Sequence, residues 1–143
     1  MPSDLQMKAM NAIHRTMLKA TGGTFGWNLL GMPVVELTTT GRKSGEQRTV
    51  MLTSPWQEDG SYVVVASRGG DDKPPAWLLN LQASPAVQVA VGGKPAAPWT
   101  AQVATAEERA RLWPLLTAKH KNYAGYQRKT DREIPLVLLR PTR

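Results

Sequence analysis

The sequence VVELTTTGRKSGEQRTVMLTSPW, residues 34–56, contains the pattern that sets the fold class. Residues 34–40 and 47–56 are rich in Val, Leu and Thr, which favour strands, and two glycines lie between these runs. Two antiparallel strands joined by a turn over residues 41–46 are therefore predicted. The turn is basic, because it contains Arg42 and Lys43 and because Arg48 follows it closely.

Further strands follow at short intervals. Asp-Gly at residues 59–60 predicts a hairpin turn before a third strand over residues 62–67, and the first three strands are expected to form a meander. Three more strands are predicted over residues 86–91, 97–106 and 134–141. The fold class is thus mainly β (α+β), a small barrel of about six antiparallel strands with peripheral helices.

Three helices are predicted beside the barrel. Residues 75–84 are predicted to form a short helix, because proline is tolerated in the first turn of a helix. Residues 122–130 are predicted to form another short helical piece. Thr105 and Glu108 make a capping box, so a longer helix begins there and runs to residue 120. Pro114 is expected to kink this helix or to split it in two.

The N-terminal segment, residues 1–30, is expected to be separate from the barrel domain of residues 31–143. Apolar residues at helical spacing predict an amphipathic helix over residues 3–20, followed by a glycine-rich, irregular connection over residues 21–31. Two interpretations stay open. The helix packs on the domain, or it covers a pocket or lies on an anionic membrane.

The composition excludes several classes of protein. The chain has no cysteine, and its two histidines, His14 and His120, lie far apart, so no metal site is predicted. No apolar run is long enough to span a bilayer and no secretory signal is visible, so we expect a cytoplasmic protein, with peripheral contact at the inner membrane face as the alternative.

The net charge of +7 invites an anionic partner, but residues 41–73 carry as many acidic as basic residues. Most of the excess lies in residues 119–132, and no nucleic-acid-binding module accompanies it, so no nucleic-acid partner is expected.

Two loops are candidates for binding an anion. The turn over residues 41–46 contains an arginine, whose planar guanidinium can donate two hydrogen bonds to an anion, and a lysine with a mobile charge. In Ser-Arg-Gly-Gly, residues 67–70, the consecutive glycines allow backbone N–H groups to converge on an anion. In a meander, both loops lie at the same end of the sheet. Trp77, Tyr123 and Tyr126 add aromatic surface that suits a flat ring. Taken alone, each loop is better explained as a solvated or flexible turn, and Trp77 as core packing. The pairing of the two loops is what favours an anion site.

Four runs of the chain together resemble the deazaflavin-dependent nitroreductase family of actinobacteria. They are VVELTTTGRKSGEQRTV, VVVASRGGDDKPPAWLLNLQASPAVQVAV, ATAEERARLWPLL and YAGYQRKTDREIPLVLL. The resemblance covers residues 33–141 and implies a split β-barrel, like the FMN-binding barrels, that binds coenzyme F420. This cofactor is a 5-deazaflavin with a phospholactyl-oligoglutamate tail.

The resemblance also implies roles for single residues. Arg42, Lys43 and Arg48 would hold the anionic tail. Ser67, Arg68 and Gly69 would hydrogen-bond the linker or the ring, with Trp77 packed nearby. Val50 and Met51 stand where the family commonly has an Asn-Pro pair near the ring, so contact there would depend on backbone groups.

Tyr126 and Tyr123 match two of three family tyrosines, and His120 replaces the third. The tyrosines are expected to orient the acceptor or to donate a proton, and His120 is a second candidate donor.

The implied activity is hydride transfer from reduced F420 to a small hydrophobic acceptor, which is an activated alkene or enone, an unsaturated ester, a quinone or a nitroarene. Two alternatives stay open, an FMN-dependent oxidoreductase and a non-catalytic carrier of F420 or of a lipid. Both a monomer and a dimer are compatible with the sequence.

Overall fold

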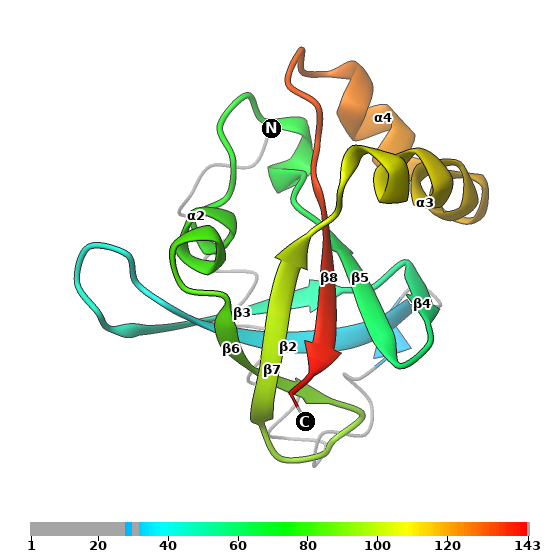
Figure 1. Ribbon diagram of the computed structural model, residues 1–143. Coiled ribbons are helices and arrows are strands. Elements are labelled where there is room, and N and C mark those ends of the chain that lie inside the picture. The colour runs from blue at the N-terminus through cyan, green and yellow to red at the C-terminus, as the bar shows by residue number, and fades with distance from the viewer. Residues whose placement is uncertain (1–27, 30–31, 143) are drawn as a thin grey trace.

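Eight antiparallel strands form one sheet that curls around a common core (Figure 1). The computed structural model describes residues 28–29 and 32–142, so the predicted helix over residues 3–20 lies outside the described residues. The strands are β1 (Asn28–Leu29), β2 (Met32–Thr40), β3 (Gln47–Thr53), β4 (Trp56–Glu58), β5 (Ser61–Val65), β6 (Ala86–Val91), β7 (Ala97–Val103) and β8 (Leu136–Pro141). Their order is β1-β2-β6-β7-β8-β5-β4, with β3 paired to β2.

The β2–β3 hairpin confirms the first prediction. Leu37 pairs with Val50 and Val35 with Leu52, so these four side chains share the face that points into the barrel. β2 pairs with β6 along its other edge and is therefore a central strand. β1, however, is a short strand paired to the start of β2, where the sequence predicted an irregular connection.

The predicted meander is wrong beyond this hairpin, and the predicted strand over residues 47–56 is two strands. β5 pairs with β4 and β8, and it does not pair with β3. The break falls at Ser54 and Pro55, where proline has no N–H to give to the ladder. The buried Ser54 Oγ lies 2.7 Å from the carbonyl oxygen of Val63, which fixes the chain as it crosses into the second half of the sheet.

The hairpin turn between β4 and β5 confirms the Asp-Gly prediction. Asp59 has a φ of 51° and Gly60 a φ of 77°. Both residues are thus in the left-handed region that a tight two-residue turn requires.

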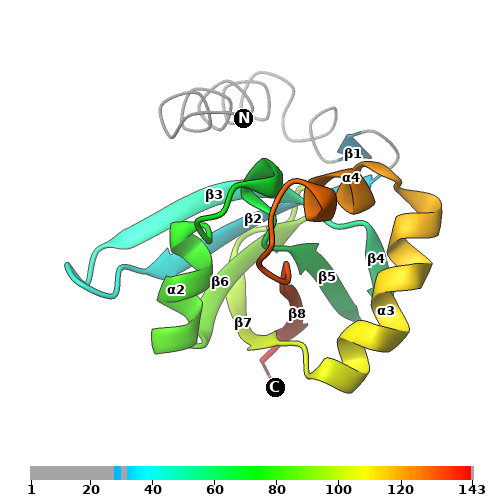
Figure 2. The same ribbon diagram turned by 90° about the horizontal axis from the view of Figure 1, so that it is seen from above.

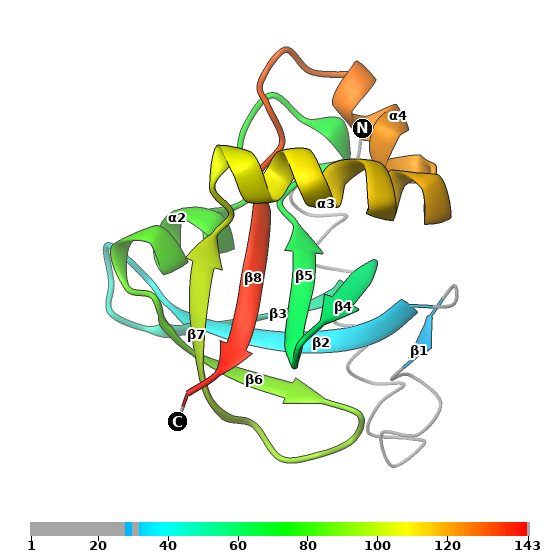
Figure 3. The same ribbon diagram turned by 45° about the vertical axis from the view of Figure 1, so that its right-hand side comes forward.

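β5 and β8 are buried on both faces, which explains their continuous apolar sequences. Val64 and Leu139 point into the barrel interior, whereas Val63 and Leu138 point to a second core. This second core is closed by the helices α3 (Ala106–Lys119) and α4 (Asn122–Arg128), which pack outside the barrel (Figure 3).

The helices begin and end close to the predicted residues. α2 (Ala76–Ala83) packs on the barrel interior, and the Thr105–Glu108 capping box starts α3 as predicted. Pro114 lies inside α3 and does not split it. The loop after β5 contains a short 3₁₀ turn, η2 (Arg68–Gly70). The prediction of a mainly β barrel with peripheral helices is confirmed.

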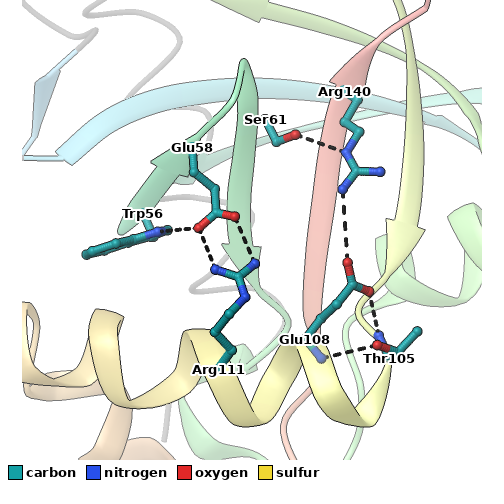
Figure 4. Close-up of polar contacts among 7 residues, drawn as sticks. All are labelled: Trp56, Glu58, Ser61, Thr105, Glu108, Arg111 and Arg140. Carbon is teal, nitrogen blue, oxygen red and sulfur yellow. Dashed lines mark hydrogen bonds and ion pairs between the residues drawn. The ribbon is translucent and has the colours of Figure 1, made fainter.

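Ion pairs tie α3 to the sheet (Figure 4). Nη1 and Nη2 of Arg111 donate to the Glu58 carboxylate at 2.9 and 2.8 Å, joining α3 to β4. Farther along, Arg140 of β8 donates to Ser61 Oγ at 3.0 Å and lies 4.0 Å from Glu108. These contacts lie at the start of β5, away from the loop that follows it.

Candidate functional site

The basic turn between β2 and β3 is closed by its own backbone. Gly41 N donates to Glu46 O at 2.7 Å, and Gly45 N donates to Gly41 O at 2.8 Å. Gly45 has a φ of 74°, a value that a residue with a Cβ rarely adopts. The turn therefore presents its side chains from a defined backbone.

Arg42 is anchored to α2, which lies beside this turn in Figure 2. Both Arg42 N and Nη1 donate to Asn80 Oδ1, at 3.2 and 3.0 Å. Asn80 is buried, and its Nδ2 donates to the buried Thr39 Oγ1 at 3.2 Å. Sequence reasoning missed Asn80, although a lone asparagine in the apolar helix sequence WLLNL is the kind of residue that needs a partner.

Lys43 and Arg48 lie on the surface. Arg48 forms an ion pair with Glu46 at 3.1 Å, and both side chains are more than half exposed. Such an exposed pair is weak and opens readily to a stronger anion. Two of the predicted tail-binding cations thus lie in the turn and the third, Arg48, at the start of β3. Arg42 is held by the buried Asn80.

The loop after β5 has an unusual backbone. Arg68 has a φ of 48° and Gly70 a φ of 85°, and a left-handed conformation is uncommon for a non-glycine residue. Ser67 is buried, and Arg68 lies 3.6 Å from Asp71. Conformations of this kind persist only where the surroundings impose them, and they cluster at binding sites.

This loop packs directly against α4. A Cβ on Gly70 would lie 2.7 Å from Tyr126 O, so only glycine allows this approach. The ring centroids of Tyr123 and Tyr126 are 5.9 Å apart in an edge-to-face arrangement. The structure therefore packs Gly70 against the backbone of Tyr126, on the helix that bears both predicted tyrosines.

The two tyrosines have different surroundings. Tyr123 is buried, and its hydroxyl lies 3.2 Å from Thr53 Oγ1 and donates to Met32 Sδ at 3.7 Å. Burial raises the pKa of Tyr123, and the hydrogen bond with Thr53 opposes this shift. Tyr126 is only partly buried, with Lys129 Nζ 5.7 Å from its ring centroid. Thr53, which sequence reasoning missed, connects Tyr123 to β3.

His120 caps the C-terminal end of α3, where its N–H donates to Leu116 O at 2.7 Å. Its Nε2 is buried without a hydrogen-bond partner among the residues that the structure describes. Burial lowers the pKa of His120, and the charge of Lys119 lowers it further. The imidazole is thus neutral near neutral pH.

The remaining predicted residues have core positions. Val50 packs against the barrel interior, whereas Met51 is buried on the opposite face with Val34. Adjacent strand residues point to opposite faces, so the two side chains do not meet one ligand together. Trp77 is 7% exposed and belongs to the barrel core.

The turn after β2 and the loop after β5 lie at the same end of the strands, although the two strands are not part of one meander. Four antiparallel pairings separate β2 from β5, so the two strands run in the same sense along the sheet. The chain therefore leaves β2 and β5 at the same end of the sheet, and α2 follows the loop after β5.

Within residues 28–29 and 32–142, no group of three or more His, Asp or Glu side chains is arranged to hold a metal ion. In the same part of the chain, no helix has the length and apolar character needed to cross a membrane.

Comparison with known proteins gives consistent matches. The family model described as F420H(2)-dependent quinone reductase matches residues 10–141. An F420H(2)-dependent quinone reductase of Mycobacterium tuberculosis (strain ATCC 25618 / H37Rv) is 37% identical over 131 residues, which cover 89% of this chain and 87% of that protein.

Two solved structures share the fold. One, described as a domain-swapped dimer, has a TM-score of 0.68 and 40% identity, and the match covers 92% of this chain and 98% of that chain. The other, an F420-H2 dependent reductase, has a TM-score of 0.65 and 45% identity. That match covers 75% of this chain and 93% of the other chain.

Proposed function

The chain belongs to the F420H(2)-dependent quinone reductase family, and from this premise we propose that it binds reduced coenzyme F420 and reduces a quinone. One observation carries the proposal for the site. The left-handed loop at residues 67–70 packs against the helix that bears Tyr123 and Tyr126. Cofactor-binding backbone and acceptor-binding side chains would thereby be neighbours.

The residues present fit the chemistry of the cofactor. Its phosphate and glutamate groups need cations, and Arg42 and Lys43 in the turn and Arg48 at the start of β3 offer three of them. Exposed cations suit a long tail that remains partly solvated. The loop at residues 67–70 would hold the part of the cofactor nearer the ring.

When bound, the reduced deazaflavin supplies the hydride. Tyr126 would bind the oxygen of the acceptor or donate the proton, because its hydroxyl has no hydrogen-bond partner within the described part of the chain. Tyr123 would support Tyr126, since its own hydroxyl is already engaged by Thr53 and Met32. His120 stays the second candidate donor, but it ranks behind Tyr126, because its lowered pKa leaves little of the imidazolium form that could give up a proton.

The acceptor is tested by following the absorbance of reduced F420 on adding a naphthoquinone, an enone, an unsaturated ester or a nitroarene. We expect the quinone to be reduced fastest. Rapid reduction of the nitroarene with a slow quinone reaction would contradict the proposal. Binding of F420 without turnover of any acceptor would favour a carrier.

An FMN-dependent oxidoreductase is tested by titrating the protein with FMN and with F420 while following tryptophan fluorescence. Tight binding of FMN without binding of F420 would contradict the proposed cofactor.

We also propose that the chain forms a dimer, because a structure 40% identical to it is a domain-swapped dimer. Light scattering during size-exclusion chromatography tests this, and a monomeric mass at micromolar concentration would contradict it. The membrane contact of residues 3–20 stays a prediction.

A further inference from the structure

Arg132, from the segment that leads into β8, binds the loop after β5. Its Nε donates to Asp71 O at 2.9 Å, and its Nη2 donates to Ser67 O at 2.9 Å and to Ala66 O at 3.1 Å. One guanidinium thus holds three backbone carbonyl oxygens, at both ends of a short loop.

Thr130 adds a contact at the end of the same loop. Its buried hydroxyl donates to Asp72 Oδ1 at 2.7 Å and accepts a hydrogen bond from Arg132 N at 3.3 Å. Asp71 and Asp72 also lie close enough to raise the pKa of Arg132, against the larger lowering caused by burial. Residues 130–132 therefore hydrogen-bond residues 66–72 at three backbone carbonyl oxygens and at one side-chain carboxylate.

The loop has few hydrogen bonds of its own that would hold this shape. Gly70 N donates to Ser67 O at 3.0 Å and Asp71 N donates to Arg68 O at 3.3 Å, which close a single 3₁₀ turn. The left-handed φ of Arg68 is unfavourable for a residue with a Cβ. An external partner is needed to stabilise it, and the guanidinium of Arg132 is such a partner.

The hydrogen bonds also orient the peptide groups. In a trans peptide the N–H points opposite to the C=O. Because the carbonyls of Ala66 and Ser67 point to Arg132, the N–H groups of Ser67 and Arg68 point away from it. Arg132 thereby binds the carbonyl oxygens on one side and fixes the direction of these peptide groups, so that the N–H of Ser67 faces the other side, where an anionic or carbonyl group would bind.

We propose that Arg132 is a positioning residue for the cofactor, which holds residues 66–71 in the shape that binds F420 without touching F420 itself. This inference rests on the proposed function. It assigns a role to the Thr-Asp-Arg sequence at residues 130–132, on a different segment from the predicted cofactor-binding residues.

The test compares Arg132→Gln and Arg132→Lys with the matched control Arg140→Gln. Arg140 also donates to β5, but at Ser61, the opposite end of the strand. For each protein we would measure the dissociation constant of F420, the KM and kcat with reduced F420 and a naphthoquinone, and the thermal midpoint. Deuterium exchange of the Gly70 and Asp71 amides reports on the loop without any cofactor.

We expect Arg132→Gln to weaken F420 binding by about tenfold or more, with kcat at saturating cofactor changed by less than about threefold. Arg132→Lys, which keeps the charge but loses the fork, should restore part of the affinity, and Arg140→Gln should bind as the wild type does. An unchanged dissociation constant in Arg132→Gln, or an equal loss in Arg140→Gln, would overturn the inference.

If Arg132→Gln does not fold, Arg132→Lys takes its place, and wild-type affinity in that variant would overturn the inference. If the wild type itself does not bind F420, the proposed function fails. The role of Arg132 in holding the loop is then still decided by exchange at Gly70 and Asp71. Faster exchange in the variant supports it, and equal exchange contradicts it.

Discussion

Tyr123 and Tyr126 lie one helical turn apart on α4, and their environments separate their roles. The Tyr123 hydroxyl has two partners, Thr53 and Met32, in a buried position. The pKa of Tyr123 is raised by burial, so this hydroxyl stays protonated across the neutral range. Tyr126 is partly exposed and is the better placed of the two to meet an acceptor.

We therefore expect Tyr126→Phe to lower kcat by about tenfold to a hundredfold while leaving the affinity for F420 and the thermal midpoint near their wild-type values. Tyr123→Phe should instead destabilise the fold by about 1 kcal/mol, because it removes a buried hydrogen bond. Steady-state kinetics and denaturant unfolding of both variants check this. Equal losses of kcat would show that the hydroxyls act together.

Asn80 is the residue that connects the basic turn to the body of the protein. Asn80→Ala should cost about 1–3 kcal/mol of stability, since Thr39 loses its partner in the core. It should also weaken F420 binding about as much as Arg42→Ala does, because Arg42 is no longer held. Denaturant unfolding and an F420 titration of both variants test this. A destabilised Asn80→Ala with unchanged F420 affinity would make Asn80 purely structural.

At the residue scale, the sequence indicated the side chains that carry charge or aromatic rings but missed those that position them. Arg42 and the tyrosines follow from residue type and spacing. Asn80 and Arg132 act through partners 38 and about 60 residues away, and no local pattern specifies such contacts.

At the scale of elements, β8, like its neighbour β5, contributes side chains to both cores. Leu138 packs under α3 and α4, and Leu139 packs inside the barrel. Each of Leu138→Ala and Leu139→Ala should cost about 2–5 kcal/mol, because both leave a buried cavity. Thr100→Ala, an exposed change on the neighbouring β7, should cost less than about 1 kcal/mol. Urea unfolding checks the three, and a small cost for Leu138→Ala would mean that the helices pack loosely.

The pair of Glu58 and Arg111 gives α3 a pH-dependent attachment. The hydrogen bond from Arg111, supported by that from Trp56, lowers the pKa of Glu58 below its ordinary value of 4.5. The pair therefore stabilises the fold above that value, and this contribution is lost as the pH falls through the lowered pKa.

We expect Glu58→Gln to lower the thermal midpoint by only a few degrees at neutral pH, since both side chains of the pair are partly exposed. The difference from the wild type should shrink when the pH falls below 4.5. A difference that is constant from neutral to acid pH would show that the charge of Glu58 is not what matters.

The strands and helices that begin or end at a turn or capping motif could be predicted from the sequence. The pairing of the strands could not. The Asp-Gly turn and the Thr105 capping box fixed the ends of β4, β5 and α3. The pairing of β5 with β8 joins residues more than 70 positions apart, and it is decided by burial on both faces of each strand. The meander prediction failed because it assumed that consecutive strands are neighbours.

At the scale of the whole molecule, the strand order sends the turn after β2 and the loop after β5 to the same end of the barrel, and Gly70 of the second loop packs against α4. The predicted resemblance to F420-dependent reductases is confirmed by the family match. The predicted fold follows from the same matches, because related structures cover most of the chain. The assignment of single residues to the cofactor stays a proposal.

The most direct test of the account is the dissociation constant of F420 for two matched variants. Lys43 and Lys94 are both exposed lysines in hairpin turns. Lys94 follows β6, which is antiparallel to β2, so it lies at the opposite end of the strands from Lys43. Lys43→Ala should weaken F420 binding about three- to tenfold, and the loss should shrink as the salt concentration rises. Lys94→Ala should bind F420 as the wild type does, and equal affinities for F420 in the two variants would contradict the proposed site.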